Sequence, residues 1–225
     1  MFPIALQLYS VRDFSEKDFF ATLEKVKKMG YDGVEFAGYY DKSPEEIRDF
    51  CKKISLIPIS AHVSIDEMSQ DPEKTFSNYS TIGCKYIAVP YLCETDRPGG
   101  EKFAETVKSI ENLSKIAKKY GLTMLYHNHD FEFKKINGEY GLDLLYRLLS
   151  PDILQTELDL CWVNVGGENP SDFLRKYTDR APVVHLKDFV MKNRGRKEGL
   201  YELIGIKPTD VQADEGDFAF RPIGQ

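Results

Sequence analysis

The sequence predicts a single-domain β/α barrel, in which parallel strands alternate with the helices that cover them. Short apolar runs alternate with helical patterns seven times along the chain, which indicates a parallel sheet with covering helices. The turn after the first apolar run, Ser10-Val11-Arg12-Asp13, contains no glycine, whereas a doubly wound nucleotide-binding sheet normally has a glycine-rich first turn. No change of composition marks a linker, so we treat residues 1–225 as one domain.

Seven segments have the apolar character of buried strands, and they are residues 4–9, 33–36, 58–63, 85–91, 122–126, 154–159 and 183–188. Helices are predicted between them over residues 15–30, 43–54, 72–82, 101–120, 141–149 and 170–177. Ser15 and Ser43 are predicted N-caps, and Gly30 and Gly121 are predicted helix ends. The first helix is expected to place Met29 on its apolar face.

The composition argues against several classes of partner. The net charge is −6 with both signs interspersed, which is atypical of proteins that bind nucleic acid or anionic membranes. No apolar stretch approaches the roughly 18–20 residues of a membrane span, and the N-terminus lacks the pattern of a secretion signal. The four cysteines form no Cys-x-x-Cys pair, so we expect reduced thiols in a cytoplasmic protein.

The densest group of chemically active side chains follows the fifth predicted strand. His127, Asn128, His129, Asp130 and Glu132 stand here in close succession. Buried strands favour apolar residues, so polar groups at a strand's carboxyl end indicate a site that opens there. The alternative is a hydrogen-bonded strand end without a ligand.

Further acids and histidines follow the other predicted strands, and they are Glu35, His62, Asp159, His185, Lys187 and Asp188. In a parallel barrel the carboxyl ends of the strands meet at one mouth, so we expect these side chains to surround one site. Carboxylates with imidazole and without sulfur suit Mn²⁺, Mg²⁺, Co²⁺ or Zn²⁺.

Five segments carry specific motifs in chain order: Leu6-Gln7-Leu8-Tyr9-Ser10-Val11-Arg12, Gly33-Val34-Glu35, Tyr126-His127-Asn128-His129-Asp130-Phe131-Glu132-Phe133, Leu158-Asp159 and His185-Leu186-Lys187-Asp188. Together they resemble the sugar phosphate isomerase/epimerase group, whose members are xylose isomerase-like TIM barrels. Relatives in that group include inosose dehydratase, hydroxypyruvate isomerase and tagatose 3-epimerase. The resemblance covers residues 1 to about 190 and implies a (β/α)8 TIM barrel.

The sequence contains one β/α unit fewer than such a barrel needs. Residues 190–225 form an irregular tail with a basic loop, an acidic segment and a short extended piece at residues 218–223. We expect a sequence truncated before strand eight, or a barrel that is open or completed by a neighbouring chain. A homodimer therefore stays open as an alternative.

The resemblance implies one divalent metal ion, held by Glu, Asp, His and Glu from strands five to eight. Asp159 and His185 match the strand-six and strand-seven positions. At strand five we favour Glu132 as the ligand, with His127 second, and the strand-eight Glu has no counterpart. A buried Asp–His hydrogen bond without metal is the alternative for Asp159 and His185.

Other roles are expected at the same mouth. Glu132 and Lys187 are candidate catalytic groups, although Lys187 equally suits an ion pair with Asp188 or Glu157. Side chains expected to contact substrate are Glu35, His62, Asn128, His129 and Trp162. A packing role is the alternative for Trp162, the only tryptophan.

These residues and the resemblance imply a metal-dependent isomerase or epimerase of a sugar or sugar derivative, acting through a metal-stabilised enediolate. A lyase that dehydrates an inosose or keto-sugar in the same site is a second hypothesis. A barrel that binds carbohydrate without catalysis is a third. Endonuclease chemistry is disfavoured, because the chain has only four histidines and a negative net charge.

Overall fold

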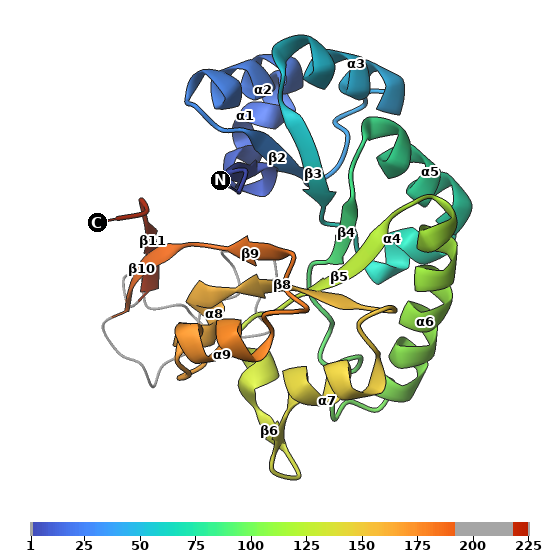
Figure 1. Cartoon of the computed structure of the whole chain (residues 1–225), viewed down its shortest axis with the longest axis vertical. Coiled ribbons are helices and arrows are strands. Elements are labelled where there is room, and N and C mark those ends of the chain that lie inside the picture. The colour runs from blue at the N-terminus through green and yellow to red at the C-terminus, as the bar shows by residue number, and fades with distance from the viewer. Residues whose placement is uncertain (1, 192–217, 225) are drawn as a thin grey trace.

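A computed structural model describes residues 2–191 and 218–224 of the chain, and its centre is a curled parallel sheet (Figure 1). The parallel strands are β1 (Ala5–Gln7), β2 (Gly33–Phe36), β3 (Ile57–Ala61), β4 (Tyr86–Val89), β5 (Thr123–His127), β8 (Gln155–Asp159) and β9 (Val183–His185). They pair in this order as a three-stranded group, β1-β2-β3, and a four-stranded group, β4-β5-β8-β9. A parallel bridge between His62 and Ala88 joins the two groups. The predicted parallel α/β class is confirmed, and the sheet forms a half-barrel.

Helices connect successive strands and cover the outer face of the sheet (Figure 1). They are α1 (Arg12–Lys17), α2 (Phe19–Lys28), α3 (Pro44–Ile54), α4 (Ile65–Gln70), α5 (Pro72–Ile82), α6 (Phe103–Lys119), α7 (Gly141–Leu148), α8 (Leu160–Val165) and α9 (Pro170–Lys176). Two 3₁₀ turns, η1 (Leu8–Val11) and η2 (Phe131–Phe133), follow β1 and β5. Buried apolar side chains from the strands and the inner faces of the helices form the main core. A smaller cluster packs buried residues of α8 against apolar side chains at positions 189–191 and 218–220.

The helix starts test the capping predictions. Ser43 begins α3 with a capping box, because Ser43 Oγ accepts from the Glu46 amide at 3.2 Å and the Glu46 carboxylate accepts from the Ser43 amide at 2.9 Å. The helix predicted from Ser15 is instead divided into α1 and α2. Asp18 caps α2 by accepting from the Ala21 amide at 3.0 Å, and Ser15 lies buried within α1. Met29 is 72% exposed, so its expected core position is wrong.

Several short elements were not predicted from the sequence, among them α4, α8 and the hairpin of β6 (Lys135–Ile136) and β7 (Glu139–Tyr140). Each is short, with at most six residues in one segment, so hydrophobic periodicity has little to act on. The helix α8 begins directly after Asp159, the last residue of β8. That junction sets the position of one predicted site residue.

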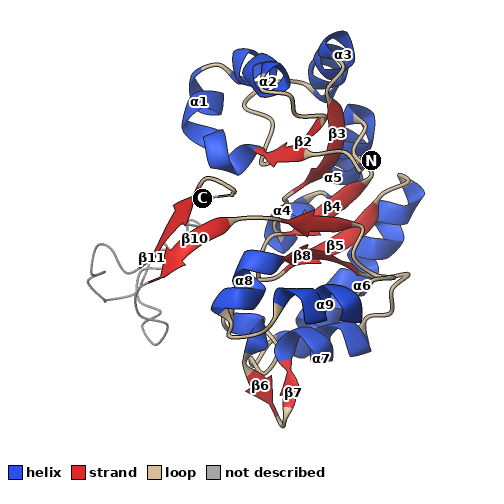
Figure 2. Ribbon diagram, turned by 60° about the vertical axis from the view of Figure 1, so that its left-hand side comes forward, coloured by secondary structure: helices blue, strands red, loops and turns tan. Residues whose placement is uncertain are grey.

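After β9 the chain leaves the parallel sheet. Residues 188–191 form β10 (Asp188–Met191), which pairs antiparallel with β11 (Phe218–Arg221), and Figure 2 shows these two strands set apart from the parallel strands. The extended piece predicted near Phe218 is therefore confirmed, whereas the predicted basic loop and acidic segment lie outside the described residues. Within the described residues no eighth parallel strand lies between β1 and β9.

Two expectations from composition concern the cysteines and possible membrane spans. All four cysteines are free, and Cys93 is exposed while the other three are buried. Among the helices of the described ranges, none combines the length and apolar character needed to cross a membrane.

Candidate active site

Side chains from four strands converge at the carboxyl ends of the sheet. Glu35, His62, Glu157 and His185 each place one ligand atom so that all four atoms lie within 4.8 Å of one another. We call these residues the four-residue cluster. His185 Nε2 lies 2.8 Å from Glu35 Oε2 and also contacts Glu157 Oε1. His62 Nε2 lies 3.2 Å from Glu157 Oε2 and 3.5 Å from Glu35 Oε2.

The strands themselves bring these side chains together. Glu35 on β2 meets His185 on β9 across 150 positions of sequence, because the curl of the sheet turns these two strands toward each other. On β8, Glu157 and Asp159 are two residues apart and therefore share one face of the strand. Their partners in the parallel ladder with β9 are Val183 and His185. The polar face of β8 thus points into the barrel.

The charges in the cluster shift the pKa values of its histidines. Burial lowers the pKa of His62 and His185, but the carboxylates of Glu35 and Glu157 more than offset this, so both pKa values are raised. Burial raises the pKa of Glu157, yet the neighbouring His185 and His62 hold it well below its usual range. Glu35 is also held by Ser60 Oγ at 2.5 Å and by Gln7 Nε2 at 2.9 Å.

This donor set fits a divalent cation. Each of the two imidazole Nε2 atoms faces both carboxylates, although a single ring N–H donates one good hydrogen bond. A divalent ion would balance the two buried carboxylate charges and would accept a lone pair from each imidazole. Neither ring would then need to donate to two carboxylates at once. The set contains nitrogen and oxygen donors and no sulfur, as expected for a catalytic rather than a structural ion.

Asp159 lies beside the cluster but points to other partners. Its Oδ2 atom accepts from Lys187 Nζ at 2.5 Å, and it lies 3.2 Å from His127 Nε2 and 3.8 Å from His185 Nδ1. Its Oδ1 atom accepts from the Trp162 amide at 3.0 Å and so caps α8. Burial raises the pKa of Asp159, but Lys187 and His127 bring it far below its usual range. Asp159, predicted as a ligand, therefore lies outside the four-residue cluster, and its carboxylate contacts Lys187 and His127.

His127 belongs to a second, overlapping group of possible ligands. His62, His127 and His185 place one ring nitrogen each within 4.8 Å of one another. His127 Nδ1 lies 3.1 Å from the carbonyl oxygen of Pro90. Burial lowers the pKa of His127 to about 4, so the ring is neutral near pH 7 and retains one lone pair.

Glu132, the favoured strand-five ligand, is outside both groups. Its side chain is buried, with Oε1 accepting from the Tyr126 hydroxyl at 2.5 Å and Oε2 accepting from the His129 amide at 2.8 Å. Burial raises the pKa of Glu132 to about 7. The alternative of a solvated loop acid is wrong, and the structure does not bring this carboxylate to the four-residue cluster. The 3₁₀ turn η2 directs Glu132 back toward Tyr126.

The three other residues expected to contact substrate are completely or almost completely buried. Asn128 is 0% exposed, and its amide group pairs with the backbone of Asp159 at 2.9 and 3.2 Å. Trp162 is 0% exposed and stacks on Phe218 of β11, with ring centres 5.9 Å apart. The packing alternative therefore describes Trp162. His129 is 2% exposed and lies between Phe131 and Trp162.

The sequence predicted His185 as a ligand and placed Glu35 and His62 at the mouth as substrate contacts. The structure adds both of them to the candidate ligands. Glu157 was named only as an ion-pair partner of Lys187. Its signal is the alternation of Gln155, Glu157 and Asp159 with apolar or small residues, which marks a polar face on a central strand.

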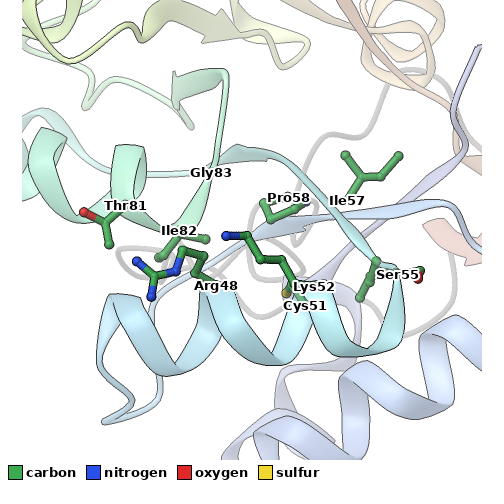
Figure 3. Close-up of a pocket in the computed structure, with 10 residues that line it drawn as sticks. Arg48, Cys51, Lys52, Ser55, Ile57, Pro58, Thr81, Ile82 and Gly83 are labelled. Carbon is green, nitrogen blue, oxygen red and sulfur yellow. The ribbon is translucent and has the colours of Figure 1, made fainter.

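A separate pocket of about 520 Å³ lies at the opposite ends of the strands (Figure 3). Its walls are the end of α3, the start of β3 and the end of α5, including Lys52, Pro58 and Gly83. None of its lining residues is an acid or a histidine, so this pocket has no groups for the metal chemistry of the cluster.

Comparison with curated proteins finds inosose dehydratases. That of Lacticaseibacillus casei is 23% identical over an alignment 231 positions long, which covers 92% of this chain and 77% of the relative. That of Clostridium perfringens strain 13 is 27% identical over an alignment 248 positions long, which covers 98% of this chain and 82% of the relative. The chain is therefore shorter than these relatives.

Similar solved structures share the fold. A sugar phosphate isomerase/epimerase from Parabacteroides distasonis has a TM-score of 0.71 and 23% identity, covering 95% of this chain and 92% of that one. The IOLI protein with a bound zinc atom has a TM-score of 0.67 and 15% identity, covering 86% and 76%. A family model described as xylose isomerase-like TIM barrel matches residues 23–225. The chain belongs to the xylose isomerase-like TIM barrel family.

Proposed function

We propose that this protein is a divalent-metal-dependent isomerase or epimerase of a sugar or sugar derivative, which moves a proton on a carbon next to a carbonyl group. The observation that supports this most directly is the four-residue cluster, in which two carboxylates and two imidazoles converge at the carboxyl ends of parallel strands. This end of the sheet is where TIM barrels place their catalytic groups.

Glu35, His62, Glu157 and His185 are the residues that would hold the ion. When bound, a divalent ion supplies Lewis acidity toward a carbonyl or hydroxyl oxygen. The buried position of these ligands limits access of water, which strengthens every electrostatic interaction in the site. Mn²⁺, Mg²⁺, Co²⁺ and Zn²⁺ all accept mixed oxygen and nitrogen donors to different degrees.

Lys187 is the residue that we assign to a substrate oxygen. Its side chain is 27% exposed, so its ammonium group can reach a ligand at the mouth while Asp159 holds it at 2.5 Å. An ammonium group in this position donates a hydrogen bond to an oxygen that gains negative charge during proton transfer. Asp159 and Asn128 act behind it by fixing its position.

A lyase is the second candidate function. The curated relatives are inosose dehydratases, and dehydration begins with the same removal of a proton next to a carbonyl group. Loss of a neighbouring hydroxyl group as water would then replace return of the proton. The third candidate is a barrel that binds carbohydrate without catalysis.

Proton NMR in deuterated water tests the proposal on a panel of keto-sugars and inososes, with Mn²⁺ or Zn²⁺ added. Exchange of the proton next to the carbonyl group is expected with the wild-type protein. Glu157→Gln should lower the exchange rate by about 100-fold or more, because it removes a ligand of the ion. Glu139→Gln, which changes a carboxylate of the β6–β7 hairpin paired with Arg147, is the matched control and should retain exchange.

The products separate the candidates. A new sugar isomer or epimer supports the first function, and an absorbing enone supports dehydration. Sugar binding without exchange in the metal-loaded protein would support the binding barrel. A wild-type protein that binds no divalent ion by calorimetry would refute the metal-dependent proposal altogether.

A further inference from the structure

The buried oxygen Asp159 Oδ2 is surrounded by three nitrogen atoms next to the four-residue cluster. Lys187 Nζ lies at 2.5 Å, His127 Nε2 at 3.2 Å and His185 Nδ1 at 3.8 Å. Asp159 is 0% exposed, so its charge requires compensation from these neighbours. The nearest cationic side chain is Lys187.

Both hydrogen-bond neighbours of the His127 ring are acceptors. The carbonyl oxygen of Pro90 lies 3.1 Å from Nδ1 and Asp159 Oδ2 lies 3.2 Å from Nε2, so a singly protonated ring can donate to only one of them. With the proton on Nδ1, Nε2 directs a lone pair toward Asp159 Oδ2. Two electron-pair donors that face each other at 3.2 Å repel unless they share a cation.

This separation also matches that of two ligands on one ion. With metal–ligand distances of about 2.1 Å in a tetrahedral site, neighbouring donor atoms lie about 3.4 Å apart. His127 is close to the cluster, since one of its ring nitrogens lies within 4.8 Å of ligand atoms of His62 and His185. His127 and Asp159 therefore have the geometry of a second cation position beside the first.

We propose that the ammonium group of Lys187 occupies this second cation position, formed by His127 and Asp159, and thereby limits the centre to one divalent ion. This inference rests on the proposed function for the first ion. Neutralising Lys187 would leave the buried carboxylate of Asp159 without its compensating charge, and a second divalent ion would take its place.

Metal stoichiometry tests the inference without any substrate. Wild-type protein and variants are dialysed to equilibrium against Zn²⁺, and in parallel against Mn²⁺, and bound metal is measured by elemental analysis. We expect one equivalent in the wild type and two in Lys187→Met, with Lys187→Gln as a second neutral variant of different shape. Lys187→Arg retains a cation and should bind one.

Two further variants locate the second ion. Asp159→Asn combined with Lys187→Met should return the stoichiometry to one equivalent, because the carboxylate of the second position is gone. Lys176→Met is the matched control, since it removes a lysine paired with Asp143 at 2.6 Å on α7, away from the cluster. It should bind one equivalent. Circular dichroism establishes that each measured variant is folded.

The outcomes distinguish the two proposals. One equivalent in the wild type and in both folded neutral variants would overturn the role of Lys187 and leave the proposed function intact. Two equivalents in the wild type would also overturn it. No bound metal in the wild type would overturn the proposed function, and this inference with it.

Discussion

Replacing Glu132 by glutamine should change how the stability of the protein depends on pH. Glu132 is 2% exposed, and burial raises its pKa from 4.5 to about 7. In the unfolded chain this carboxyl group ionises near its usual pKa, so between the two values the folded protein binds more protons than the unfolded chain. Stability therefore falls as pH rises through this window.

The magnitude follows from the size of the shift. Each pKa unit corresponds to about 1.4 kcal/mol, so the rise to about 7 is equivalent to about 3 kcal/mol. This contribution is fully present below the unfolded pKa and is lost once the pH exceeds the folded pKa. The amide side chain of the variant does not titrate, so the stability of wild type relative to Glu132→Gln should fall by about 3 kcal/mol between about pH 4 and pH 8.

Urea denaturation at several pH values measures this difference. A chelator should be present, because metal binding is itself pH-dependent and stabilises the folded state. His62 and His185 also titrate, but they are present in both proteins and their effect cancels in the difference. Parallel stability curves for the wild type and Glu132→Gln would refute the claim that this buried carboxyl group is held in its protonated form near neutral pH.

Two further substitutions test the packing around the site. Gly33→Ala should destabilise the protein by about 1–3 kcal/mol or more in urea denaturation, because the new Cβ would lie 2.5 Å from the backbone oxygen of Ile57; wild-type stability would contradict this. Asn128→Ala should cost about 2–5 kcal/mol, because it removes both hydrogen bonds between the Asn128 side chain and the buried backbone N–H and C=O of Asp159. The exposed Asn112→Ala is its control, expected within about 0.5 kcal/mol of the wild type, and an equal effect of the two changes would argue against the backbone pairing.

The tertiary structure changed the assignment of particular residues more than it changed the fold. The alternation of strands and helices predicted the parallel sheet, and the boundaries of α5 and β2 were predicted to the residue. The helix predicted from Ser15 failed because Asp18 competes as an N-cap in the same segment. Short elements such as α8 were missed, since fewer than two helical turns carry little periodic signal.

The sequence by itself determined the class of the fold, the edge of the sheet where acids and histidines gather, and the position of His185 among them. Strand periodicity and the shared direction of parallel strands are enough for that. Only the tertiary structure decided that Glu35, His62 and Glu157 join His185, while Glu132 turns away toward Tyr126. The reason is physical: which side chains meet depends on the curl that brings β2 to β9 and on the path of the loop after β5, and neither is encoded in local spacing.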